Sequence, residues 1–225
     1  MKPKKFLIFD AGPIISLTMN GLLPVLEKLK EEFDGEFIIT PLVKKELVDN
    51  AMRVKKYELE AVRVKNLIEK GVLKMSSEYM KDNVLERTTN KLMGLANKIF
   101  KARGDRVRII QKGEASCLAF SMLCGCENVI VVDERTTRLL TESPENLKKL
   151  MERKLHARVE MLGNNVKDFK NFKYIRSAEL LYIAYKKDLL DLKKDALLLD
   201  ALLYGVKFKG AAISSKEIET IKSLV

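Results

Sequence analysis

The architecture of this chain follows from one short run near its start, Lys5-Phe6-Leu7-Ile8-Phe9-Asp10. An uninterrupted apolar run that closes on an acid is typical of a strand covered on both faces of a parallel sheet. Ala11-Gly12-Pro13 follows, and a proline this early favours the start of a helix, which should end near Asn20-Gly21. Asp10 is therefore predicted to lie where a strand turns into a helix, at the sheet edge where ligands gather.

The same pattern of a strand and an acid returns later in the chain. Asn128-Val129-Ile130-Val131-Val132-Asp133 predicts a second buried strand, with a helix from about Arg135. Between the two, Glu36-Phe37-Ile38-Ile39-Thr40 runs into Pro41, and Thr40 is the expected helix cap. This alternation predicts an α/β fold with a central, mainly parallel sheet and helices on both sides. Further helices are expected over 51–70, 82–103, 178–190, 195–206 and 214–224, and short strands over 72–75 and 157–162.

Two more acids are predicted close to the core. In the helix after Pro41, Glu46 shares a face with Leu42, Val43 and Leu47, so it should point inward or towards the edge of the core. Glu114 follows Gly113 in the first turn of another helix, where the helix dipole favours a carboxylate.

Asp10, Glu46, Glu114 and Asp133 thus form a set of four carboxylates crowded by hydrophobic residues. Unpaired charge is costly to bury, and the usual compensator for several acids is a divalent cation with oxygen ligands. Two such cations bridged by carboxylates supply a nucleophilic water and neutralise charge at phosphorus. The chain has a single histidine, His156, which argues against a histidine-based nuclease. We therefore expect metal-dependent phosphodiester hydrolysis.

The net charge of +11 predicts a polyanionic partner. The excess is concentrated in residues 87–112, where a single acid, Asp105, accompanies a run of basic side chains: Arg87, Lys91, Lys98, Lys101, Arg103, Arg106, Arg108 and Lys112. Arg103, Arg106 and Arg108 are the candidates for phosphate contacts. A solvated helix face, or the Lys/Arg-rich surface of a heat-adapted protein, would explain the same charges.

Other features of the sequence exclude several classes of protein. With 225 residues, 47% of them hydrophobic, the chain can bury a substantial core, yet no apolar run approaches the roughly 20 residues of a membrane span. The N-terminus lacks the apolar segment of a signal peptide, so we expect a cytoplasmic protein without membrane contact. Cys124-Gly125-Cys126 has no second cysteine pair, which argues against a zinc site.

Several ordered motifs together resemble the PIN domain family, in particular the prokaryotic branch that includes VapC-type toxins. The motifs are residues 6–16, Glu46 after Thr40-Pro41, Gly113-Glu114-Ala115, and Val131-Val132-Asp133-Glu134, within roughly residues 5 to 160. The resemblance implies a three-layer α/β/α sandwich and an Mg²⁺- or Mn²⁺-dependent ribonuclease. It implies that Asp10, Glu114 and Asp133 hold the metal, with Glu46 as the fourth acid, and that Ser16 supplies a small hydroxyl near the substrate.

The resemblance also bears on organisation and partners. Residues 1–165 would be the nuclease domain, with a helical, basic insertion around 78–110, and residues 166–225 a C-terminal helical extension packed on the same domain. The chain is longer than compact toxins of this type, which fits either a specialised substrate or a lost toxin role. RNA is the implied partner, an antitoxin protein would accompany a toxin, and a homodimer is expected.

Each assignment has a simpler alternative. Asp10 and Asp133 would also serve as caps for the helices after their strands, Glu46 as a lysine partner, and Glu114 as a first-turn acid. Glu134 either joins the acidic set or, as is more usual, faces solvent. A phosphotransferase of the haloacid-dehalogenase type is disfavoured because its second aspartate would fall at Gly12. A non-catalytic RNA-binding or assembly module that keeps the PIN-like fold remains the main alternative to an enzyme.

Overall fold

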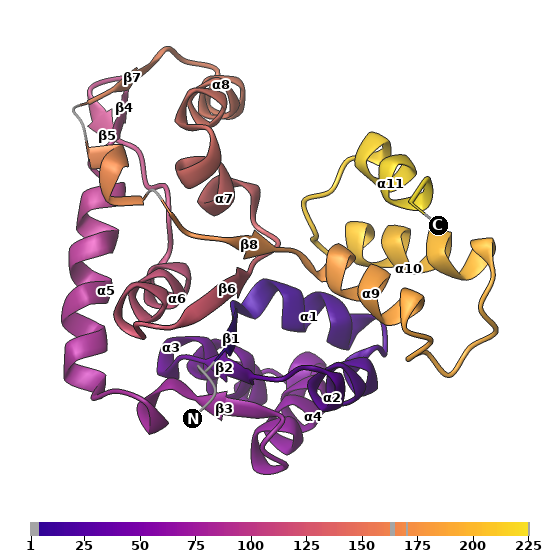
Figure 1. The fold of residues 1–225 in the computed structure, drawn as a ribbon. Coiled ribbons are helices and arrows are strands. Elements are labelled where there is room, and N and C mark those ends of the chain that lie inside the picture. The colour runs from indigo at the N-terminus through magenta and orange to yellow at the C-terminus, as the bar shows by residue number, and fades with distance from the viewer. Residues whose placement is uncertain (1–4, 163–164, 170, 225) are drawn as a thin grey trace.

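The structure, a computed structural model, describes residues 5–162, 165–169 and 171–224. These residues form an α/β fold around a five-stranded, all-parallel sheet, together with a small antiparallel sheet (Figure 1). The predicted fold class is confirmed. The parallel sheet has the order β3-β2-β1-β6-β8, and its strands are β1 (Lys5–Phe9), β2 (Glu36–Ile39), β3 (Leu73–Met75), β6 (Glu127–Val131) and β8 (Tyr174–Ile175).

Strands β1 and β6 form the centre of this sheet, as their apolar sequences predict. Phe9 pairs in parallel register with Val131, and both are fully buried. The Asp10 N–H continues the ladder by donating to the Val131 carbonyl oxygen at 3.0 Å. Because both strands run in the same direction, the residues that follow them, Asp10 and Asp133, lie at the same edge of the sheet.

Helices cover the sheet on two sides. Helix α6 packs on β1, β6 and α5, whereas α1 contacts α2, α4 and α9 on the other side of the strands (Figure 1). The expected starts of the helices near Gly113 and Arg135 are confirmed. The helices are α1 (Ala11–Met19), α2 (Leu23–Glu32), α3 (Pro41–Lys44), α4 (Glu58–Glu69), α5 (Asp82–Ala96), α6 (Lys112–Leu123), α7 (Arg135–Glu142), α8 (Pro144–Leu155), α9 (Ser177–Lys186), α10 (Ala196–Phe208) and α11 (Ser215–Lys222).

The last third of the chain belongs to the same core. Strand β8 adds the fifth strand beside β6, so the segment 166–225 supplies part of the sheet as well as helices. Leu199, Leu203 and Ile218 on the final helices are buried in the common hydrophobic core. Over the residues that the structure describes, no helix has the length and apolar character needed to cross a membrane.

The helix predicted over 82–103 is wrong at its end. Helix α5 stops at Ala96, and the chain turns into an antiparallel sheet of order β5-β4-β7. Its strands are β4 (Phe100–Ala102), β5 (Asp105–Arg106) and β7 (Val159–Met161), the last of which was predicted. Phe100 is fully buried and pairs with Met161, so long-range packing overrides the helical preference of the local sequence.

The continuous helix predicted over 51–70 is also wrong. The chain leaves α3 through a π-helical segment, η1 (Lys45–Asn50), and two 3₁₀ turns, η2 (Ala51–Arg53) and η3 (Lys55–Tyr57). Val54 between these turns has an extended backbone, which interrupts helical hydrogen bonding, and α4 begins at Glu58. Two further 3₁₀ turns are η4 (Ser76–Glu78) and η5 (Asn165–Phe169).

Candidate active site

Asp10 is a buried acid at the turn from β1 to α1, with 8% of its surface exposed. Burial raises its pKa, and the charges of Glu114 and Glu46 raise it further. The N–H groups of Ala11 and Gly12 act in the opposite direction, and the pKa nevertheless rises from the ordinary 3.8 to about 7. Asp10 therefore titrates near neutral pH, and a positive charge beside it would favour its ionised form.

Glu46 reaches the same place from another element. It lies in η1, and π-helical segments are rare and occur often at functional sites. A Cβ atom placed on Gly113 would lie 3.6 Å from Glu46 Oε2 and 3.8 Å from Asp10 Oδ1, so both oxygens border one small space. Because glycine has no side chain, this space stays open. Burial raises the pKa of Glu46, although the residue is exposed, whereas the sequence predicted that it points inward or towards the edge of the core.

Glu114 is held in the first turn of α6 by two hydrogen bonds. The Gln111 N–H donates to its Oε2 at 2.7 Å, and the Thr137 hydroxyl donates to its Oε1 at 2.6 Å. Burial raises the pKa of Glu114; these two bonds lower it, and the charges of Glu134 and Glu46 raise it. The pKa of Glu114 is raised overall. Glu114 is thus a fixed, buried carboxylate beside the other two acids.

Asp133 flanks Asp10 but has partners of its own. Asp133 Cβ and Asp10 Oδ2 both lie 3.8 Å from the position that a Cβ on Gly12 would take. The Ser177 N–H donates to Asp133 Oδ1 at 2.9 Å, and the Ser177 hydroxyl donates to Oδ2 at 2.8 Å. Asp133 therefore holds the start of α9. Burial raises its pKa, and the hydrogen bonds from the Ser177 N–H and hydroxyl offset this rise only partly.

Glu134 is a fifth acid, close enough to Glu114 for its charge to raise the pKa of Glu114. Its Oε1 accepts from the Thr136 N–H at 3.3 Å and caps α7, so Glu134, and not Asp133, caps the helix after β6. Glu134 is exposed, as is usual for such a residue, but it also lines a pocket of about 330 Å³ together with Arg108 and Glu114.

The four predicted substrate-binding residues lie in different surroundings. Ser16 is buried on α1 near Asp133, and its hydroxyl donates to the Lys209 carbonyl oxygen at 3.4 Å. Arg108 borders the pocket at Glu114, and Arg106 is exposed on β5. Arg103 is different, because it donates to the Leu155 carbonyl oxygen at 3.0 Å at the end of α8. It therefore stabilises a helix terminus.

The predicted quartet is acidic, and its charges need a counter-ion. Within the residues that the structure describes, none of Asp10, Glu46, Glu114 and Asp133 forms a salt bridge. Carboxylate oxygens are the ligands that Mg²⁺ and Mn²⁺ prefer, so the donor set fits such an ion. Across the same described ranges, no three Asp, Glu, His or Cys side chains already stand in a metal-ligating arrangement. Binding would therefore require the acids to turn towards the ion.

Two residues that matter here were missed from the sequence. Ser177 holds Asp133, and Thr137 holds Glu114. Ser177 follows a strand of only two residues, β8, which is too short for an apolar pattern to reveal. Thr137 lies within a helix and carries no motif. Only the fold brings either hydroxyl to its acid.

Comparisons with protein-family models, with curated proteins and with solved structures find no match to this chain. The resemblance to PIN domains therefore stays a prediction. Any function must be inferred from the side chains themselves.

Proposed function

We propose that this protein is a divalent-metal-dependent endoribonuclease that hydrolyses RNA phosphodiester bonds, as a VapC-like toxin or an RNA-processing nuclease. The observation that carries the proposal is that Asp10 Oδ1 and Glu46 Oε2 border one space at the carboxyl edge of the sheet, where the charge of Glu114 also raises the pKa of Asp10. A net charge of +11 supports a polyanionic substrate. Three further parts of the proposal rest on the resemblance to PIN domains: that the substrate is RNA, that the protein is a homodimer, and that an antitoxin accompanies it if it is a toxin.

The chain's own residues would hold and orient the reacting groups. Asp10 and Glu114 would bind Mg²⁺ or Mn²⁺, with Asp133 as a flanking ligand and Glu46 as a ligand or an acceptor for water. When bound, such an ion supplies charge neutralisation at phosphorus and activates water. Ser177 and Thr137 would fix Asp133 and Glu114, as outer hydrogen bonds do in metal sites. Arg108, at the mouth beside Glu114, would contact a phosphate.

One observation favours a non-catalytic RNA-binding module instead. Both oxygens of Glu114 and both of Asp133 already accept hydrogen bonds from the protein. Such bonds would give these acids a structural role without any metal. The two candidate functions differ in whether RNA is cut, which a single substitution tests.

Asp10→Asn keeps the shape of the side chain and removes its charge. We expect cleavage of an unstructured single-stranded RNA, measured with Mg²⁺ and with Mn²⁺, to fall more than about a hundredfold, because even outer-shell changes cost about 10- to 100-fold. Asp191→Asn is the matched control, since Asp191 is an exposed acid paired with Lys28. Circular dichroism would verify folding. Parental cleavage by folded Asp10→Asn would refute the metal-nuclease proposal.

A further inference from the structure

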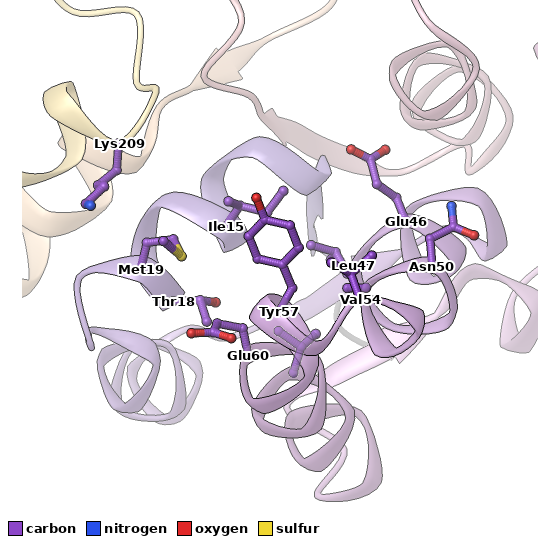
Figure 2. A pocket seen from close by; sticks show the side chains of 12 residues that line it. Ile15, Thr18, Met19, Glu46, Leu47, Asn50, Val54, Tyr57, Glu60 and Lys209 are labelled. Carbon is purple, nitrogen blue, oxygen red and sulfur yellow. The ribbon is translucent and has the colours of Figure 1, made fainter.

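A pocket of about 480 Å³ extends along α1 from Glu46 (Figure 2). Glu46 is the one member of the acidic centre, the set Asp10, Glu46, Glu114 and Asp133, that lines it among the described residues. Glu46 lies at one end of it, and Lys209 lies at its rim on the far side. Its walls come from α1, from the irregular segment η1 to η3, and from α4. Val54, where the helix is interrupted, and Tyr57 both line this pocket.

The walls are unusually apolar for a surface. Ile15, Met19, Val54 and Tyr57 all line the pocket, and each exposes between 39% and 46% of its surface. Figure 2 shows the Tyr57 ring standing in the middle of the group. Large apolar side chains gathered at one exposed place mark a binding site more often than a structural need.

Polar groups at the pocket have the character expected for a nucleotide ligand. Glu60 Oε2 is buried and has no hydrogen-bond partner within the described part of the chain. If the Glu60 side chain turned towards the pocket that it lines, a donor on a ligand would satisfy this oxygen. Two cations are close by: Lys209 at the rim, and Lys56, whose Nζ lies 5.3 Å from the centre of the Tyr57 ring.

We infer that this pocket binds an unpaired nucleobase of the substrate strand, one nucleotide or a few from the phosphate at the acidic centre. This inference rests on the proposed nuclease function for the identity of its ligand. The base stacks on Tyr57 between the apolar walls, and Lys209 and Lys56 contact neighbouring phosphates. Glu60 accepts a hydrogen bond from the base.

Glu60 also sets the preference among bases. Guanine presents an N–H and an amino group side by side, which suits a carboxylate, and adenine and cytosine each present an amino group. Uracil presents its one N–H between two carbonyl oxygens, which repel a carboxylate. The pocket should therefore disfavour uracil. A protein segment is the weaker candidate because two lysines and a buried carboxylate fit a phosphorylated base better than an apolar side chain.

The test is a titration with nucleoside monophosphates in EDTA, followed by NMR or calorimetry. We expect GMP to bind at least about tenfold more tightly than UMP, and ribose 5-phosphate more weakly than either. Tyr57→Leu should weaken GMP binding about tenfold or more, whereas the matched Tyr57→Phe, which keeps the ring, should preserve it. Glu60→Gln should narrow the difference between GMP and UMP.

Two results would overturn this inference. One is equal binding of ribose 5-phosphate and GMP. The other is unchanged GMP affinity in Tyr57→Leu; if that variant instead lost self-association in sedimentation, the pocket would be a contact between copies of the chain.

The titration separates this inference from the nuclease proposal because it needs neither metal nor cleavage. Asp10→Asn should bind GMP like the parent while losing RNA cleavage. If the parent binds GMP but cuts no RNA, the nuclease proposal fails and the base pocket stands. If the parent cuts RNA but GMP does not bind, the base pocket alone is wrong.

Discussion

Asp10 makes the stability of the metal-free protein depend on pH. Its pKa is about 7 in the folded protein and close to 3.8 when the chain unfolds, so between these values the folded state binds more protons. Stability then falls as pH rises, because ionisation of the buried acid is unfavourable. Each pKa unit corresponds to about 1.4 kcal/mol, so the free energy of unfolding falls by a few kcal/mol as Asp10 ionises.

Asp10→Asn removes this titration. In EDTA, we expect the variant to be more stable than the parent above pH 7, with the difference shrinking towards zero near pH 4. Urea unfolding at several pH values measures this difference in the free energy of unfolding. The control is Asp191→Asn, whose stability should depend on pH as that of the parent does. A difference independent of pH would show that Asp10 does not titrate as described. Saturating Mg²⁺ should reverse the order of stability, since only the parent keeps all ligands.

Among the elements, helix α5 is followed by Asn97, which fixes the segment that leads to Glu114. Asn97 Oδ1 accepts from the N–H of Ile109 at 2.6 Å and from that of Ile110 at 3.2 Å. Both isoleucines are buried, so these N–H groups depend on Asn97. This side chain ties the end of α5 to the segment that leads into α6 and Glu114.

Asn97→Ala should therefore lower the free energy of unfolding by about 2 kcal/mol, the cost of leaving buried donors without partners. Denaturant unfolding provides the measurement, and hydrogen exchange should show lost protection at Ile109 and Ile110. Asn83→Ala, an exposed position on the same helix, is the control and should change little. Equal effects of the two substitutions would contradict the role assigned to Asn97.

Some of these elements could be predicted from the sequence and others could not. Strands β1 and β6 were predictable because an unbroken apolar run has few other uses, and each carries its acid to a known edge of the sheet. The end of α5 and the break at Val54 were not predictable. Gly94 lies within the last turn of α5 and not after it, and neither a glycine nor a proline stands near Val54. Likewise, the sequence predicted Asp133 as a site residue but not Ser177, because only the pairing of β8 with β6 brings Ser177 to Asp133.

Across the whole molecule, the basic side chains of residues 87–112 have two different roles. Arg106 and Arg108 are exposed, and Arg108 lies beside the acidic centre, whereas Arg103 is engaged by the end of α8. Replacing Arg106 and Arg108 together by alanine should weaken RNA binding for all sequences. It should also flatten the salt dependence by up to about two units of slope.

Arg103→Ala should instead lower stability slightly and leave that slope nearly unchanged. Filter binding or fluorescence anisotropy at several salt concentrations, with Ca²⁺ in place of Mg²⁺, would compare the variants. If the salt dependence of RNA binding were unchanged in the double variant, the basic residues of 87–112 would be a solvated surface and not a phosphate-binding one.

The bond between Asp133 and Ser177 joins residues 44 positions apart, through a strand of two residues. A ribosome making this chain has added all four acids by the time it reaches Asp133, but the serine that fixes the last of them is added much later. Pairing of such distant segments is also slow to form. For a protein proposed to cut RNA, the order of synthesis thus delays the finished site until most of the chain has left the ribosome, itself built of RNA.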